Sequence, residues 1–222
     1  MKNAFGGLLN ERRHYTHQYI HETLVDLLMI QRRIHRGVFA VMDGTFAGDG
    51  PGPRCMTPYV KNVLLASADQ VAIDAVAAKL MGFDPLQIRF IRLAHELGLG
   101  CGDVRKIEIA GEPQLAEENW HFVGPFRRMT FASKGQHALY WGPLRPLQKL
   151  LLQTVLAPWA YLASWIYHDV YWYPFVGRER VHDALGSPWG MLFRNYERLE
   201  PDERGWQIQA VRLADSVDQR AG

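Results

Sequence analysis

Apolar positions recur at helical spacing over residues 12–35 and predict a long amphipathic helix that ends at Gly37. Short apolar runs at residues 37–42 and 60–66 are typical of strands. A third run, at residues 104–110, alternates apolar and polar positions and predicts another strand.

Two further helices are marked by their end signals. Asp69 precedes an apolar helical run that stops at Gly82. Asp84 and Pro85 then open a helix that continues to Leu97. Because strands alternate with helices, we expect an α/β fold with a small, mainly parallel sheet flanked by helices.

The chain changes character after Gly111, since residues 120–175 are rich in Trp, Tyr and Phe. We therefore expect an α/β portion over residues 1–111 followed by an aromatic-rich helical extension over residues 112–199. The polar residues 200–222 are expected to form a flexible tail.

Composition and charge narrow the class of protein. The 222-residue chain is 48% hydrophobic and 22% charged, with a net charge of +2. These values fit a globular protein and argue against a nucleic-acid partner, since the basic residues form no long stripe. Cys55 and Cys101 lack metal-ligand spacing, so we expect buried, unreactive thiols. No secretory pattern is recognisable, so we expect a cytoplasmic location, with membrane association as an alternative.

Four carboxylates follow the predicted strands, where ligands of parallel sheets gather. Asp43 and Asp49 lie in a glycine- and proline-rich stretch, in which Gly50 would let a ligand approach the backbone. Asp74 lies in an apolar helix, where a carboxylate needs a partner or a metal. The candidate residues for binding a divalent cation are Asp43, Asp49 and Asp74. The candidate residues for contacting a bound small molecule or anion are Gly50 and Asp69. A turn, a helix cap or a structural ion pair is the alternative for each carboxylate.

Histidine spacing gives a second candidate site. His14, His17 and His21 would share one helix face and could bind a transition metal, or form a partly solvated face. Near them in sequence, Lys2 and Asn3 stand beside a glycine pair and are candidate anion-binding residues.

The segment Leu150–Tyr167 is uncharged and crowded with aromatic residues. It predicts a packed helix or partner-binding surface, a membrane-surface helix, or a membrane span. A protein partner or self-association would use the longer stretch Leu150–Phe175.

Several motifs in these segments resemble the family called domain of unknown function 362. They are Lys2-Asn3 with Gly6-Gly7, Asp43-Gly44 with Gly48–Pro51, Ala68–Asp74, Leu80–Pro85 and Gly98–Gly100. The resemblance covers residues 1–111 and implies the C-terminal half of the family domain. We therefore expect a short form, a mis-assigned start or a fragment. Some family members carry iron–sulfur clusters on cysteine motifs, and this chain is expected to carry none.

These observations lead to three hypotheses about function. The leading one is a small-molecule enzyme or ligand-binding module with a carboxylate-rich, metal-dependent site at strand ends, and catalysis is left open. The second is a non-catalytic subunit or docking module for an iron–sulfur redox partner. The third is a membrane-peripheral protein.

Overall fold

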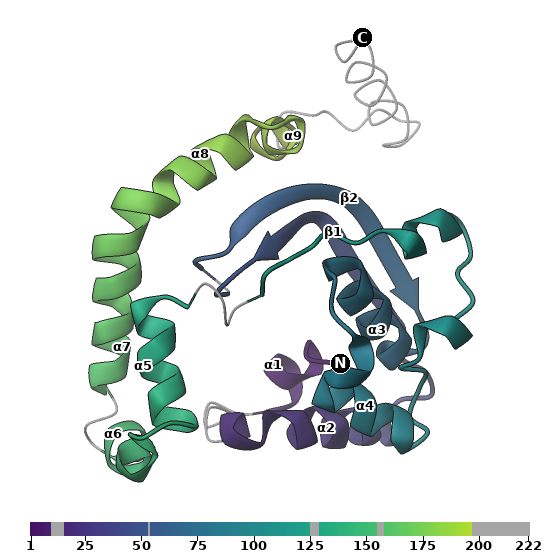
Figure 1. The fold of residues 1–222 in the computed structure, drawn as a ribbon, viewed down its shortest axis with the longest axis horizontal. Helices are drawn as coiled ribbons and strands as arrows, with labels where there is room; N and C mark the ends of the chain where they lie inside the picture. Colours follow the sequence, from purple (N-terminus) through teal and green to yellow (C-terminus); the bar gives the residue numbers. More distant parts are fainter. Residues whose placement is uncertain (10–15, 53, 125–128, 155–157, 197–222) are drawn as a thin grey trace. The chain divides into compact units, whose positions relative to one another are not determined.

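The protein divides into two compact units, Met1–Ser164 and Trp165–Gly222. The computed structural model describes residues 1–9, 16–52, 54–124, 129–154 and 158–196 (Figure 1). The described part of the first unit combines helices with a β-hairpin, and that of the second is helical. The chain is thus mixed helix and strand with a helical C-terminal region, as expected.

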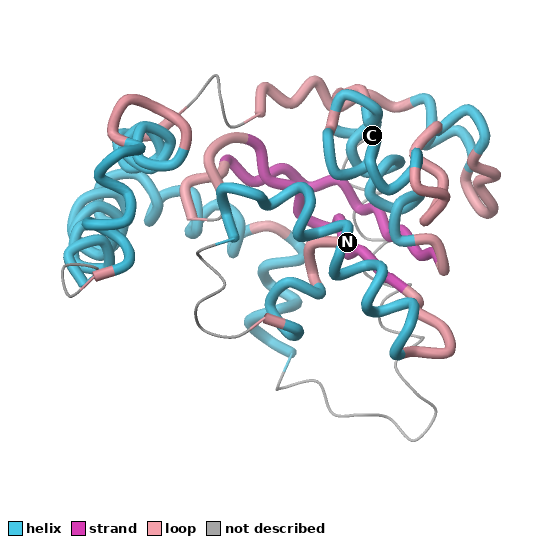
Figure 2. Tube along the Cα trace, turned by 90° about the horizontal axis from the view of Figure 1, so that it is seen from below, coloured by secondary structure: helices cyan, strands magenta, loops and turns pink. Residues whose placement is uncertain are grey.

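The sheet is an antiparallel hairpin, and the prediction of a mainly parallel sheet was wrong. β1 (Ala40–Asp49) pairs with β2 (Thr57–Ser67), and the strands run side by side in both Figure 1 and Figure 2. Both strands extend beyond the apolar runs that predicted them, which leaves residues 50–56 as their connection. A parallel crossover needs about a dozen residues or more, so this short connection favours the hairpin.

The glycine-rich stretch Asp43–Asp49 belongs to β1 and is not a loop. The strand pairing is irregular between Gly44 and Phe46, opposite Asn62, which has a left-handed φ of 55°. This irregularity is a β-bulge, at which asparagine tolerates the left-handed backbone. A Cβ atom on Gly44 would lie 2.8 Å from the carbonyl oxygen of Val63. Glycine is therefore needed at position 44 so that the two strands can approach closely. This requirement explains why the stretch is rich in glycine although it is a strand and not a ligand-binding loop.

Residues 104–110 do not form the predicted third strand. Val104–Lys106 is instead a 3-10 helix, η3, whose first turn is capped by the Asp103 carboxylate. A side-chain acceptor at this position stabilises a turn in competition with extended backbone. Within the described ranges the sheet has two strands.

Helix α3 (Gln70–Met81) confirms the predicted start and stop. Asp69 accepts hydrogen bonds from the backbone N–H groups of Val71 and Ala72, and Gly82 ends the helix with a φ of 96°. The helix contacts both strands of the hairpin. Its nearly continuous apolar sequence is explained by this burial.

Helices α2 (Ile20–Ile34) and α4 (Arg89–Glu96) pack on each other, and α4 also packs on α3. The short η2 (Pro85–Gln87), capped by Asp84, precedes α4, so the predicted helix from Asp84 is interrupted. The shared core consists of Met1, Val25, Leu28, Val71, Ala75, Ala78, Ile91 and Ala94. A second cluster joins α1 (Ala4–Leu8) to α2 and consists of Phe5, Leu24 and Leu27.

Helical segments dominate after residue 112. In the first unit they are η4 (Pro113–Glu117), α5 (Phe131–Tyr140), η6 (Arg145–Leu147), α6 (Gln148–Gln153) and α7 (Pro158–Trp165), whose last residue opens the second unit. The second unit continues with the π-helix η7 (Ile166–Gly177), α8 (Arg178–Gly186) and α9 (Pro188–Asn195). Among the described helices, none has the length and apolar character needed to cross a membrane.

Candidate functional site

Asp49 fastens a distant segment to the end of β1. Its side chain is buried, and its two carboxylate oxygens accept hydrogen bonds from the backbone N–H groups of Val123, at 3.1 Å, and Gly124, at 2.9 Å. These partners lie far along the chain, so the sequence alone gave no signal of the contact. The geometry gives Asp49 a structural role.

Asp69 joins the start of α3 to the glycine-rich segment after α4. One carboxylate oxygen caps α3, and the other accepts a hydrogen bond from the backbone N–H of Cys101 at 2.7 Å. A Cβ atom on Gly100 would collide with this carboxylate, so glycine is required there. Two motifs that carried the family resemblance, around Asp69 and around Gly100, are therefore in contact.

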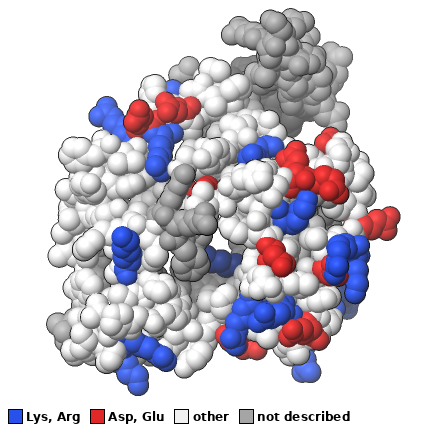
Figure 3. All heavy atoms as spheres, in the orientation of Figure 1, with Lys and Arg blue, Asp and Glu red and all other residues white. Residues whose placement is uncertain are grey.

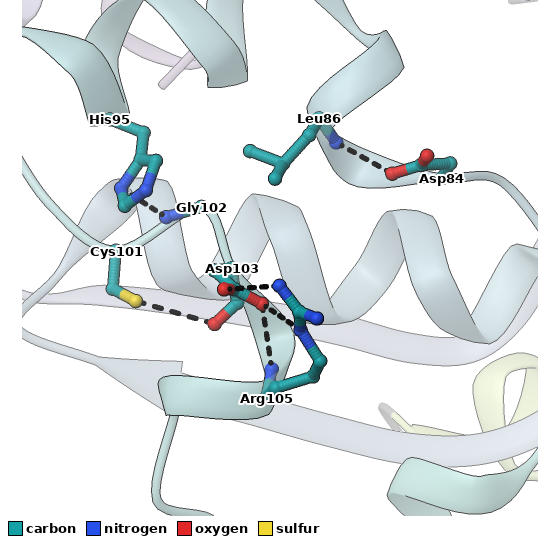
Figure 4. Close-up of polar contacts among 7 residues, drawn as sticks. All are labelled: Asp84, Leu86, His95, Cys101, Gly102, Asp103 and Arg105. Carbon is teal, nitrogen blue, oxygen red and sulfur yellow. Dashed lines mark hydrogen bonds and ion pairs between the residues drawn. The ribbon is translucent and has the colours of Figure 1, made fainter.

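Polar residues at the end of α4 and in the segment after it make further contacts that the sequence did not reveal (Figure 4). The Nδ1 atom of His95 lies 3.3 Å from the backbone nitrogen of Gly102. The Cys101 thiol donates to the carbonyl oxygen of Asp103, at 3.4 Å. The buried Asp103 carboxylate pairs with the exposed Arg105 guanidinium at 2.9 Å.

The Asp103–Arg105 pair has a clear electrostatic consequence. Hydrogen bonds from the Arg105 side chain are the main cause that lowers the pKa of Asp103 to about 2. Asp103 therefore stays ionised across the physiological pH range. The sequence signal was an Asp directly after a glycine-rich stretch and two residues before an Arg, which is a pattern for a capped turn.

The candidate metal ligand Asp43 lies apart from Asp49. Asp43 is exposed, and one of its oxygens accepts a hydrogen bond from the Thr45 backbone at 2.8 Å. Hydrogen bonds from Thr45 lower the pKa of Asp43. Six positions along a strand separate the two aspartates by roughly 20 Å, so they do not share one ligand site.

Asp74 has a different environment again. Its carboxylate lies 3.0 Å from the amino nitrogen of Met1, whose side chain is fully buried. Burial raises the pKa of Asp74, and the positive charge of the Met1 amino group opposes that rise. The partner that a carboxylate in an apolar helix needs is thus an ammonium group.

Two of the three candidate metal-binding histidines, His17 and His21, contact aromatic rings. The ring of His17 lies 5.5 Å from that of Phe5, and the ring of His21 stacks at 6.1 Å on that of Phe90. The Nδ1 atom of His21 is buried and has no hydrogen-bond partner among the described residues, and burial lowers the pKa of His21. His14 lies outside the described residues. Among the residues that are described, no group of three or more His, Cys, Asp or Glu side chains is arranged to hold a metal ion.

Lys2 and Asn3 line an open depression at the start of the chain. Its volume is about 450 Å³, and its described lining is completed by Phe5 and Gly6. The depression therefore offers one cation, one amide and one aromatic ring. Gly50 does not contribute to this described lining; it lies in the hairpin connection with a φ of 104°.

One face of the hairpin is uncovered in the described structure. Leu64 is 71% exposed, whereas the neighbouring Val63, which points to the opposite face, is 2% exposed. Val41 on the adjacent strand is 68% exposed, and so is Phe39, which lies directly before β1. We call Phe39, Val41 and Leu64 the hairpin apolar face.

Comparison with protein families confirms the resemblance at the start of the chain. The family described as Domain of unknown function (DUF362) matches residues 1–79. This range includes β1, β2 and most of α3. No curated protein and no solved structure matched the chain significantly.

Proposed function

We propose that this chain is a protein-docking module, in which the hairpin apolar face binds an amphipathic helix of a protein partner. The observation that carries the proposal is the contrast between Val63 and Leu64, which are 2% and 71% exposed. Helix α3 covers one face of the hairpin. A sheet with a helix on each face is a stable layer arrangement, and a partner helix would supply the second layer.

The chemistry of the partner follows from Asp43. This carboxylate is exposed on β1 and pairs directly with Leu64 in the hairpin register. Its pKa is lowered, so the group is negatively charged at neutral pH. A helix with an apolar stripe and a Lys or Arg beside it would complement both the apolar side chains and the charge.

We prefer the docking function to the hypothesis of a carboxylate-rich metal site because the carboxylates are engaged in separate contacts. Asp49 and Asp69 hold backbone N–H groups, and Asp74 pairs with the Met1 amino group. Titration of the full chain with Mg²⁺ and Mn²⁺ in a calorimeter tests the metal-dependent alternative directly, with Asp43→Asn and Asp74→Asn as variants.

The docking proposal is tested by photo-crosslinking from a probe placed at position 64 in the full chain, in extracts of the source cells. Mass spectrometry then identifies the residues that react. We expect them to lie on one amphipathic helix that bears a basic residue. Binding of the purified partner should weaken about tenfold or more with Val41→Asp and should weaken with Asp43→Lys. Phe131→Ser, which changes an exposed ring on α5, is the control. Crosslinks confined to second copies of this chain would reject the proposal.

A second candidate function is binding of a small anionic molecule by Lys2 and Asn3. The open depression of about 450 Å³ that they line favours this candidate. Inorganic phosphate and acetate are suitable probes for the full chain in thermal unfolding. A rise in melting temperature that disappears in Lys2→Gln, but persists in Lys79→Gln, would support it.

A further inference from the structure

The segment Trp141–Leu150 displays apolar side chains to solvent in the described structure. Trp141 and Leu150 are 52% and 51% exposed, and Leu144 and Leu147 are 43% and 45% exposed. Side chains of this kind normally avoid water, and a contiguous group of them marks an interaction surface. The segment joins α5 to α6 and includes η6.

Backbone hydrogen bonds hold this segment in a fixed shape. The N–H of Leu144 donates to the carbonyl of Ala138 at 3.1 Å, and the N–H of Leu147 donates to that of Leu144 at 3.0 Å. Gln148 is buried between its exposed neighbours. The apolar side chains are therefore presented by a hydrogen-bonded turn.

Along the chain, the charged residues in and around this segment are all basic. Residues 119–168 contain no Asp or Glu, but they include Lys134, Arg145 and Lys149. Arg145 and Lys149 are both exposed within the segment itself. The surface over α5, α6 and α7, at the lower left of Figure 3, accordingly shows basic and uncharged atoms without acidic ones.

Trp and Leu side chains interleaved with Arg and Lys are suited to the boundary between water and an anionic bilayer. We propose that Trp141–Leu150 binds the surface of an anionic lipid membrane. Trp141, Leu144 and Leu147 enter the headgroup region, while Arg145 and Lys149 contact lipid phosphates. Charge distinguishes this surface from the hairpin apolar face, where Asp43 would be repelled by anionic lipid.

This inference does not depend on the docking function, because it uses a different surface. The test is co-sedimentation of the full chain with vesicles of phosphatidylcholine alone and of phosphatidylcholine mixed with phosphatidylserine. We expect binding to the mixed vesicles, little binding to phosphatidylcholine alone, and weaker binding as salt is added.

Two variants separate the contributions. Arg145→Gln with Lys149→Gln should weaken binding to the mixed vesicles roughly thirtyfold, since each basic residue near an anionic surface contributes about fivefold. The control, Arg33→Gln with Arg36→Gln, removes the same charge from exposed positions on and after α2 and should change binding little. Leu144→Ser with Leu147→Ser should also weaken binding, and circular dichroism checks that each variant is folded.

Three results would overturn the proposal. One is no binding of the wild-type chain to mixed vesicles at low salt. The second is equal loss of binding in the two charge variants. The third is self-association that Leu144→Ser with Leu147→Ser abolishes while vesicle binding persists, because the segment would then serve a second copy of the chain.

Discussion

At the scale of single residues, the aspartates that suggested a site are engaged in holding the fold together. Asp69 was predicted correctly as a helix cap, because a cap depends on residues next to it in sequence. Its bond to Cys101 and the bonds of Asp49 to Val123 and Gly124 depend on residues that are distant in sequence. No local pattern distinguishes such a contact from a ligand contact, which is why the same residues supported a metal hypothesis.

We predict that Asp49→Ala lowers the free energy of unfolding by about 3 kcal/mol, because two backbone N–H groups lose a buried, charged acceptor. Asp49→Asn should cost less, since one oxygen acceptor is kept. Urea unfolding followed by circular dichroism measures both. Asp43→Asn serves as the control on the same strand and should leave the unfolding midpoint nearly unchanged. Equal effects of Asp43→Asn and Asp49→Asn would contradict the structural role of Asp49.

His21 gives a pH-dependent prediction. Burial lowers its pKa below the ordinary value of 6.5, so the unfolded chain takes up a proton at a higher pH than the folded chain. The contribution of His21 to stability is complete above pH 6.5 and is lost as pH falls from 6.5 through the folded-state pKa. The unfolding free energy should therefore fall on acidification, and His21→Phe should reduce that fall. His35→Gln is the control at an exposed position; an identical response in both variants would reject the assignment.

At the scale of elements, the helices near the hairpin were easier to predict than the strands. Asp69 and Gly82 mark the ends of α3 by local chemistry alone. The direction of β2 relative to β1 depends on the length of their connection, and therefore on where each strand ends. The end of β1 was hard to predict because Gly44 and Gly48 lie in it and glycine is usual in loops. The expected strand at residues 104–110 had the right alternation, but it pairs with neither β1 nor β2, and the Asp103 cap favoured a turn.

The β-bulge offers a test of the hairpin. Asn62 has a φ of 55°, a conformation that costs most residues about 1–2 kcal/mol. Asn62→Val should therefore destabilise the protein by about that amount, while Asn62→Gly should change stability by less than about 0.5 kcal/mol. Ala66→Val is the control, because it adds a branched side chain at an exposed strand position. Thermal and urea unfolding of the three variants give the comparison, and equal tolerance of Val at positions 62 and 66 would show that the bulge is absent.

At the scale of the whole molecule, exposed apolar side chains occur in both compact units. Phe39, Val41 and Leu64 are exposed in the first unit, and Phe175 and Phe193 are 74% and 77% exposed in the second. The stretch Leu150–Phe175 was predicted to serve a protein partner or self-association, and the hairpin apolar face is a surface that the sequence did not reveal. Exposed apolar surface on a protein in water favours association.

We therefore predict that the purified chain, without partner or lipid, self-associates at micromolar concentration and that a mild detergent reverses the association. Light scattering as a function of concentration measures it. Val41→Asp with Leu64→Asp should lower the apparent mass if the hairpin apolar face contributes, because charges then replace the exposed apolar groups. Thr57→Asp with Gln114→Asp is a charge-matched control outside this face. A monodisperse monomer at every concentration, with no response to detergent, would mean that these apolar surfaces are tolerated in water and would remove the physical reason for assigning them a partner.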